Sequence, residues 1–353
     1  MELQDIKSMT LAEIQESFTN DKLPKFRALQ VYQWLHRGAE SFDEMSNVSK
    51  ELREQLKAKD YISVATVEKK LISNYDNTVK YLFSFADNCC VESVVMQYKH
   101  GYSICISTQV GCRMGCTFCA TGKSGFSRNL TASEMLAQIQ SAQKDLGIQI
   151  SNIVLMGMGE PLDNYQQVLR FLELVSSDEG MNIGMRHISV STCGIVDKIY
   201  DMANRKLQCT LSVSLHAPND NLRSQTMPIN KKWGVAQLLK ACKYYSDTTR
   251  RRISFEYAMI SGLNDSDAQA QELAGKLKGI LSHVNLIPVN DVTGNHYKKS
   301  STQRLHAFCS ILEKHGITAT VRRTLGSDIQ ASCGQLQRRY KEEVNNIESA
   351  QSN

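Results

Sequence analysis

The chain has 353 residues, of which 42% are hydrophobic and 22% are charged, and its mean hydropathy is −0.32. This composition excludes fibrous and intrinsically disordered proteins, and the length allows two domains or one large barrel with appendages. No stretch approaches the roughly 18 consecutive apolar residues of a membrane-spanning helix. The first residues lack a basic segment followed by an apolar one, so the sequence predicts a cytoplasmic protein with no membrane partner.

Cysteine content and charge distribution narrow the functional classes. Eleven cysteines in a chain without a secretion signal favour reduced thiols, metal ligands or redox chemistry over a disulfide framework. The net charge is 41 − 36 = +5, but nine Lys or Arg residues against two acidic ones give +7 between residues 298 and 341. This basic segment favours a polyanionic partner, most plausibly nucleic acid, and a solvated basic face is the alternative.

The first part of the chain, residues 1–75, is predicted to form a small helical domain. Leu11, Ile14 and Phe18 recur at helical spacing, so they share one face of a helix. Pro24 then precedes a second amphipathic run.

Residues 76–100 change to β character and predict a β-hairpin that leads into the main domain at 101–341. In the main domain, strand-like segments alternate with amphipathic helical ones, and a helix is predicted to begin at Thr131 with the capping box TASE. No Gly-x-Gly-x-x-Gly follows the first strand, which argues against a dinucleotide-binding fold. The sequence therefore predicts an α/β protein with a partial (βα)6-type barrel, followed by a polar tail at 342–353.

The strongest local signal is a group of three cysteines in GCRMGCTFCATG, where Cys112, Cys116 and Cys119 have C-x3-C-x2-C spacing. Three thiolates can hold three irons of a 4Fe-4S cluster and leave the fourth iron open to a substrate. A structural zinc site is the alternative, but zinc normally takes four ligands, and no fourth Cys or His lies nearby in the sequence. The spacing favours iron–sulfur.

Because this loop follows the first strand of a (βα) series, the chain resembles the radical S-adenosylmethionine (AdoMet) superfamily. The resemblance implies that AdoMet binds the open iron and is cleaved by one electron to a 5′-deoxyadenosyl radical. Further motifs are similar, in order, to the RlmN/Cfr family of RNA adenine methyltransferases: CISTQVGC, GMGEP (157–161), STCG (191–194), SLHAP (214–218), MPIN (227–230), HVNLIPVN (283–290) and GSDIQASCGQL (326–336). The helical LPKFRALQVYQWLH resembles the RlmN type, which methylates C2 of adenine, more than the Cfr type, which methylates C8.

Several of these motifs close a predicted strand, and in a (βα) barrel the chemistry collects at the carboxyl ends of the strands. The resemblance implies that Glu160 accepts the AdoMet ammonium group, while Ser191, Ser214 and Asn290 are suited to its carboxylate, ribose or adenine. Taken singly, each is more often a polar residue at a strand end, and His216 could be a core histidine. The full predicted AdoMet site is Gly159, Glu160, Ser191, Ser214, Leu215, His216 and Asn290.

Three further residues match catalytic positions of the family: Cys105 on the first strand, Cys333 after the last, and Glu92. The resemblance implies that Cys333 takes a methyl group from one AdoMet and that a second AdoMet supplies the radical that activates this methyl group. Glu92 then removes the C2 proton of adenine, and Cys105 releases the product by forming a disulfide with Cys333. A lone cysteine is usually a small buried hydrophobe, and we expect that role for Cys89, Cys90, Cys193, Cys209, Cys242 and Cys309.

The resemblance also implies the partners: 23S ribosomal RNA at adenosine 2503, adenosine 37 of some transfer RNAs, and an electron donor such as flavodoxin or ferredoxin. In the same way it implies that residues 1–75 extend the RNA-binding surface. We expect a monomer. C8 methylation is the nearest alternative function. More distant alternatives are a radical enzyme acting on protein or small molecules, and an RNA-binding assembly factor whose cluster only stabilises the fold.

Overall fold

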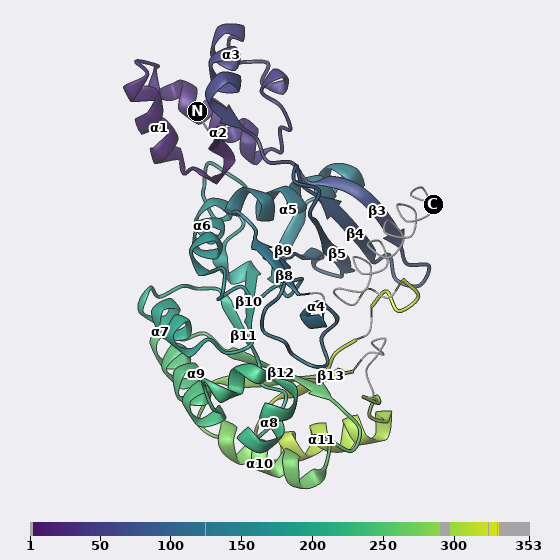
Figure 1. The fold of residues 1–353 in the computed structure, drawn as a ribbon. Helices are drawn as coiled ribbons and strands as arrows, with labels where there is room; N and C mark the ends of the chain where they lie inside the picture. The colour runs from purple at the N-terminus through teal and green to yellow at the C-terminus, as the bar shows by residue number, and fades with distance from the viewer. Residues whose placement is uncertain (1–2, 124, 290–296, 324, 330, 332–353) are drawn as a thin grey trace, which may run out of the picture.

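The computed structural model describes residues 3–123, 125–289, 297–323, 325–329 and 331. A small helical module comes first (Figure 1). In α1 the Thr10 side chain accepts a hydrogen bond from the Glu13 amide while the Glu13 carboxylate accepts one from the Thr10 amide, and Ile14 and Phe18 are buried as predicted. The elements of the module are β1 Gln4–Asp5, η1 Ile6–Ser8, α1 Leu11–Asn20, α2 Lys25–His36, η2 Phe42–Glu44, α3 Lys50–Lys59 and β2 Asp60–Tyr61, with β1 and β2 paired in parallel.

The central element is a ten-stranded sheet with the order β14-β13-β12-β11-β10-β9-β6-β5-β4-β3. Its first strands form an antiparallel meander: β3 Thr66–Ile72, β4 Val79–Ser84, β5 Cys90–Tyr98 and β6 Gly101–Cys105. The remaining strands run parallel to β6: β9 Ile150–Leu155, β10 Ile188–Thr192, β11 Thr210–Ser214, β12 Ile253–Met259, β13 Ser282–Pro288 and β14 Ala319–Val321. The β-hairpin predicted within 76–100 corresponds to β4 and β5, and β3 extends this antiparallel sheet back to Thr66.

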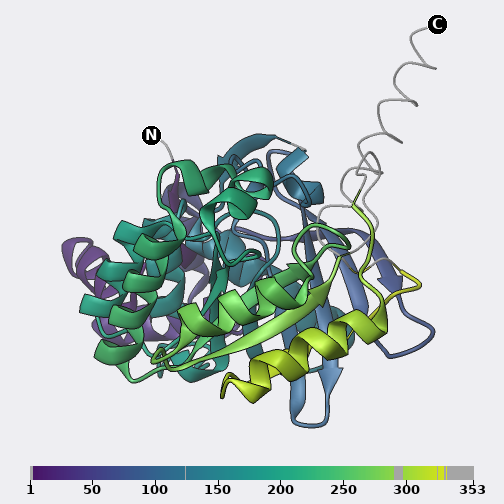
Figure 2. The ribbon, with the colours of Figure 1, turned by 90° about the horizontal axis from the view of Figure 1, so that it is seen from below.

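Helices connect the parallel strands and lie on the outside of the curved sheet (Figure 2). The capping box predicted at Thr131 is present and starts α5. The described part of the chain therefore contains the predicted partial (βα)6 barrel, which stays open because β14 and β3 are the two ends of the sheet order. The helices are α5 Ala132–Leu146, α6 Tyr165–Val175, α7 Val196–Asn204, α8 Asp220–Thr226, α9 Val235–Thr249, α10 Asp267–Leu277 and α11 Thr302–Lys314, with short 3-10 turns η3 Met185–His187 and η4 Pro228–Lys231.

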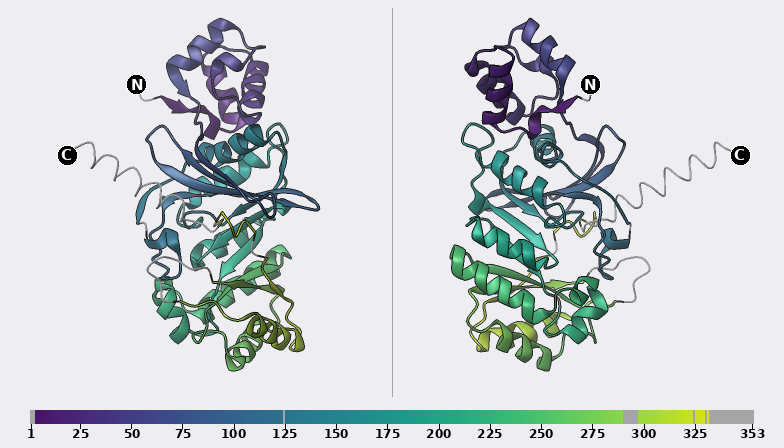
Figure 3. Two further views of the ribbon diagram at one scale, coloured as in Figure 1. Left: turned by 90° about the vertical axis from the view of Figure 1, so that its right-hand side faces the viewer. Right: turned by 60° about the vertical axis from the view of Figure 1, so that its left-hand side comes forward.

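The connection between β6 and α5 carries the three-cysteine loop. It holds a two-stranded antiparallel sheet, β7 Gln109–Gly111 with β8 Phe126–Asn129, and the one-turn helix α4 Ala120–Lys123 between them. In Figure 3 the N-terminal helices cap one end of the molecule beside α5, far from α9, α10 and α11. Among the described residues, no helix is both long enough and apolar enough to cross a membrane.

Candidate active site

The three-cysteine loop lies at the carboxyl ends of the parallel strands. Cys112, Cys116 and Cys119 are half-buried and line one cavity of about 280 Å³. Backbone hydrogen bonds fix the loop, because the Cys112 amide donates to the Gly125 carbonyl at 2.7 Å and the Thr117 amide donates to the Thr226 carbonyl at 2.9 Å.

The thiols of this loop suit an iron–sulfur cluster. Burial raises the pKa of Cys112 to about 12, and burial together with the neighbouring Cys119 and Cys112 thiols raises the pKa of Cys116 further. Three thiolates here need a strongly cationic metal centre to offset their charge. In the part of the chain that the structure describes, no three Cys, His, Asp or Glu side chains are arranged to hold a single metal ion.

The loop after β9 forms the wall beside the cysteines. Gly159 has φ +103°, and a Cβ there would lie 2.6 Å from the Gln109 side chain, so only glycine fits. Glu160 is 4% exposed, and its carboxylate accepts the amides of Cys193 at 2.7 Å and Leu162 at 3.0 Å. Burial raises the pKa of Glu160, and these hydrogen bonds oppose that rise. The carboxylate therefore ties the ends of β9 and β10 together in addition to lining the cavity.

The ends of β10 and β11 supply the opposite wall. Ser191, Ser214 and His216 line the cavity, whereas the side chain of Leu215 is fully buried and belongs to the core. The His216 Nδ1 accepts the Ala258 amide at 2.8 Å, and its ring packs edge-on against Phe118. Burial lowers the pKa of His216 to about 3, so the ring is neutral and its proton sits on Nε2.

Arg223, in α8, is a site residue that the sequence analysis missed. It is fully buried, and its guanidinium donates to the backbone carbonyls of Cys193 at 2.6 Å, Ser214 at 3.1 Å and Leu215 at 3.1 Å. It also donates to Asn230 Oδ1 at 3.1 Å. Asn230 closes the MPIN motif, which was the one sequence signal that pointed toward this network.

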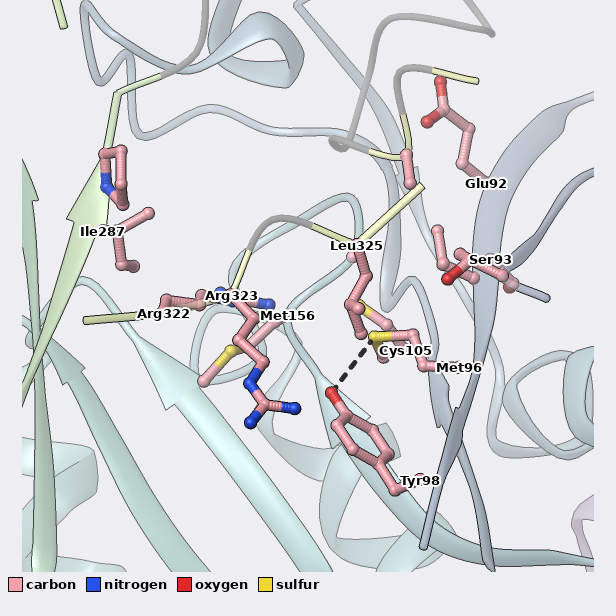
Figure 4. A pocket seen from close by; sticks show the side chains of 15 residues that line it. Glu92, Ser93, Met96, Tyr98, Cys105, Met156, Ile287, Arg322, Arg323 and Leu325 are labelled. Atoms are coloured by element: carbon pink, nitrogen blue, oxygen red, sulfur yellow. Dashed lines mark hydrogen bonds between the residues drawn. The ribbon is translucent and has the colours of Figure 1, made fainter. Parts of the chain in front are cut away.

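A second cavity of about 380 Å³ lies along the open side of the barrel and is lined by Glu92 and Cys105 (Figure 4). Glu92 is 2% exposed and forms an ion pair at 2.9 Å with the equally buried Lys80. Burial raises the pKa of Cys105, and the positive charge of Arg322 opposes that rise. Figure 4 shows Cys105 beside Met96, with Arg322 and Arg323 across the cavity.

Two predicted site residues, Asn290 and Cys333, lie outside the described residues. The segment before Cys333 is nevertheless anchored at the second cavity. The Asp328 carboxylate accepts the Ser73 hydroxyl at 2.7 Å and the Asn74 amide at 2.8 Å, and Ala331 lines the cavity. Ala331 is only two positions before Cys333 in the sequence.

Comparison with known proteins assigns both parts of the chain. Residues 106–274 match the radical SAM superfamily, and residues 4–62 match the ribosomal RNA large subunit methyltransferase N-terminal domain. A protein of Alkaliphilus oremlandii named "Probable dual-specificity RNA methyltransferase RlmN" is 53% identical over 96% of this chain and 99% of its own length. A protein of Clostridium novyi with the same name is 51% identical over 96% of this chain and 99% of its own length.

The chain belongs to the RlmN family. A crystal structure of a radical SAM methyltransferase from Sphaerobacter thermophilus agrees, with a TM-score of 0.90 and 43% identity over 94% of this chain and 98% of that one. RlmN proteins are radical SAM RNA methyltransferases, so membership implies an iron–sulfur cluster and AdoMet. In this RlmN-family chain the cavity beside Cys112, Cys116 and Cys119 has the donor set for both groups, because thiols and hydrogen-bonding strand ends share it.

Proposed function

We propose that this protein methylates C2 of adenosine 2503 in 23S ribosomal RNA and of adenosine 37 in some transfer RNAs. The contiguity of two cavities carries the proposal. The cavity of the three cysteines and that of Glu92 and Cys105 share Met156, Gly157, Ile287, Pro288 and Arg322. The cluster and AdoMet of the first cavity would therefore supply their radical chemistry next to Glu92 and Cys105.

In the first cavity we assign one 4Fe-4S cluster to Cys112, Cys116 and Cys119. AdoMet is assigned to the residues that the family motifs indicate: Gly159, Glu160, Ser191, Ser214, Leu215 through its backbone, His216 and Asn290. When bound and reduced by one electron, these groups supply a 5′-deoxyadenosyl radical. The neutral His216 offers its Nε2 proton to this site, and Glu160 presents its carboxylate from a position already fixed by backbone amides.

The protein's own residues carry the methyl group and the proton. The Cys333 thiolate takes a methyl group from a first AdoMet, which leaves as S-adenosylhomocysteine. This methyl group would give a hydrogen atom to the 5′-deoxyadenosyl radical, and its carbon would join C2 of adenine as one electron returns to the cluster. Glu92 takes the C2 proton, and Lys80 holds its carboxylate in place before that transfer. Cys105 then forms a disulfide with Cys333 as the methylated base leaves. Two AdoMet molecules are consumed in each turnover.

The substrate must present an unpaired adenine, because C2 cannot be reached while the base is stacked in a helix. We assign residues 1–75 to RNA binding along with the basic segment 298–341, and flavodoxin or ferredoxin to electron supply. We propose that the protein acts as a monomer.

The deciding experiment is anaerobic reconstitution with iron and sulfide, followed by reaction with AdoMet, a reductant and unmodified 23S RNA. Nucleosides and 5′-deoxyadenosine are measured by mass spectrometry. The wild-type protein is expected to form 2-methyladenosine, and Cys333→Ala is expected to form none. Cys309→Ala, which removes a thiol on α11 that lines neither cavity, should behave as wild type.

Other products would change the assignment. 8-Methyladenosine would place the protein with the C8 enzymes. Cleaved AdoMet without methylated RNA would mean that the substrate is a different molecule. Methylation that survives in Cys333→Ala would remove the central residue of the proposed mechanism.

A further inference from the structure

The inner face of this barrel is polar and hollow. Closed (βα) barrels fill their interior with branched apolar side chains. In this barrel the apolar residues of β10, such as Val190, are buried, whereas the polar Ser189 is half-buried. The polar Asn285 on β13 is also half-buried. These half-buried side chains line a third cavity of about 580 Å³. The barrel therefore offers a solvent-accessible polar space instead of a packed core.

Basic residues surround the end of this space that lies at the amino ends of the strands. Arg186 precedes β10, while Arg251 and Arg252 precede β12, and all three line the cavity. We call these three residues the basic mouth. Glu256 is the one acidic residue among the described lining residues, and its carboxylate accepts hydrogen bonds from Ser254 and Asn285, both at 2.8 Å. The positive charge at the mouth is therefore not neutralised locally.

The guanidinium groups of the basic mouth have unused hydrogen-bonding capacity. Arg186 and Arg252 are exposed, and neither forms an ion pair with any residue that the structure describes. Arg251 donates to the Thr210 hydroxyl at 3.1 Å, but its Nε is buried and has no partner within the described chain. A buried, unpartnered N–H group is unfavourable unless a ligand satisfies it.

The mouth is also continuous with the site of the chemistry. The third cavity shares Met96, Tyr98, Cys105, Met156 and Arg322 with the cavity that holds Glu92. A chain whose base enters beside Cys105 can therefore continue along the open side of the barrel toward Arg252. Figure 4 shows Tyr98 and Arg322 on this route, both reaching into the space.

We propose that the basic mouth binds a backbone phosphate of the RNA segment next to the target adenosine. Arginine forks match the oxygen pairs of a phosphate, and phosphate contacts set the position of a nucleic acid without reading its sequence. Such a contact holds the RNA at a second point while the target base is withdrawn from its stack. This inference rests on the proposed function and adds an anchoring site to it.

The test compares Arg186→Ala/Arg252→Ala with the control Lys240→Ala/Lys278→Ala, which removes the same charge from exposed positions on α9 and at the end of α10. Binding of a fluorescent RNA stem-loop that contains the target adenosine is measured by anisotropy over a range of salt concentrations. The mouth variant should bind about 10-fold or more weakly, and the slope of log affinity against log salt should fall by about 1 to 2. Arg252→Lys keeps the charge and should lose less affinity than Arg252→Ala.

A neutral methylphosphonate linkage placed beside the target adenosine tests the contact directly. It should weaken binding to wild type and have no added effect on the mouth variant, because the same interaction is then already absent. Bound iron and circular dichroism serve as the folding check for each variant.

The outcomes separate this inference from the function itself. If wild type and the mouth variant bind RNA with equal affinity and equal salt dependence, and 2-methyladenosine still forms normally, the basic mouth does not bind RNA. The proposed function would then be unaffected. A variant that binds RNA normally but is no longer stabilised by inorganic phosphate would identify a site for a free phosphate. A variant impaired only in reduction by flavodoxin would identify a protein-docking surface. Either result overturns the RNA assignment, whereas failure of wild type to methylate contradicts the proposed function.

Discussion

At the scale of single residues, the site depends on buried charges that are satisfied in different ways. Among the described residues Arg223 has no carboxylate partner and is satisfied by carbonyl groups at the ends of β10 and β11. Glu92 is instead compensated by Lys80 across the β4–β5 pair, where Lys80 faces Val94 and so lies diagonal to Glu92. A buried charge without such partners is strongly destabilising. The partners of Arg223 and Glu92 are therefore held in place by these contacts.

Replacing Arg223 by lysine should weaken AdoMet binding by about 10-fold or more. A single ammonium group cannot reach three carbonyls, and each buried carbonyl left without a donor costs about 1–3 kcal/mol. Isothermal titration measures the affinity for AdoMet, and thermal denaturation measures the loss of stability. Arg205→Lys, at an exposed ion pair on the rim of α7, is the matched control and should change neither. Unchanged AdoMet affinity in Arg223→Lys would mean that these carbonyls do not shape the site.

Replacing Lys80 by methionine should destabilise the protein by about 3–5 kcal/mol, because it leaves the Glu92 carboxylate buried without its cation. Lys70→Met on the neighbouring strand removes a half-exposed ion pair with Asp145 and should cost no more than about 1 kcal/mol. Denaturant unfolding of the two variants gives the comparison. Similar losses for both would show that the Lys80–Glu92 pair is not effectively desolvated. The double variant Lys80→Met/Glu92→Gln should recover part of the lost stability.

At the scale of elements, side-chain hydrogen bonds join the strand-end loops to one another. Gln109 on β7 donates to Asn129 at 2.9 Å and to Asp163 at 2.8 Å, and its side-chain oxygen accepts the Glu160 amide at 2.8 Å. One glutamine thus joins β7, β8 and the loop that follows β9. Because this loop passes close to Gln109, its backbone conformation at Gly159 controls the position of Glu160.

Gly159→Ala should therefore damage the site. The added Cβ would meet Gln109 at 2.6 Å, and the positive φ is unfavourable for alanine, so the loop must shift and release the Glu160 amide. We expect AdoMet affinity to fall by at least about 10-fold in the same titration. Gly184→Ala is the control, because its Cβ meets nothing within 4 Å and its φ is −60°. Equal affinities for the two variants would contradict this account of the loop.

At the scale of the whole molecule, the N-terminal module is joined to the barrel through α5 and α6. Arg170 on α6 forms a two-point ion pair with Glu13 at 2.7 and 2.8 Å, and Gln140 on α5 donates to the Leu35 carbonyl at 2.8 Å. His36, at the end of α2, is 6% exposed, and its Nδ1 has no partner in the described part of the chain. This junction contains ionisable groups in a dry environment, so its stability depends on pH.

Stability should fall as the pH drops from 6.5 toward 4. Burial, assisted by the positive charge of Lys7, lowers the pKa of His36 to about 4, whereas an unfolded histidine titrates near 6.5. Within this window the unfolded state binds a proton that the folded state does not, so the free energy of unfolding declines by about 1.4 kcal/mol per pH unit. His36→Gln removes that group and should show a correspondingly shallower decline in denaturant unfolding from pH 7 to 4.5. Parallel curves for wild type and variant would exclude this origin.

The family and the (βα) architecture follow from the sequence, which also predicts most of the residues proposed to bind the cofactors. Cys112, Cys116 and Cys119 are close in the chain, so their spacing alone predicts a shared cluster. Glu160, Ser191 and His216 end successive strands, and parallel strands place their carboxyl ends at one edge, so their convergence also follows from periodicity. The helix start predicted at Thr131 is confirmed, because a capping box is complete within four neighbouring residues.

Which polar groups meet across large sequence separations becomes clear only from the folded chain. Arg223 is 30 positions from Cys193, and Lys80 is 12 positions from Glu92, and nothing in the local sequence of either pair reveals the partner. In the sequence, the strand residues that face the barrel interior look like the polar half of an ordinary alternating strand. In the structure they line the third cavity, which has Arg186 and Arg252 at its mouth and persists because the sheet does not close. Local patterns fix elements and their faces, whereas long-range pairing and sheet closure depend on the simultaneous packing of the entire chain.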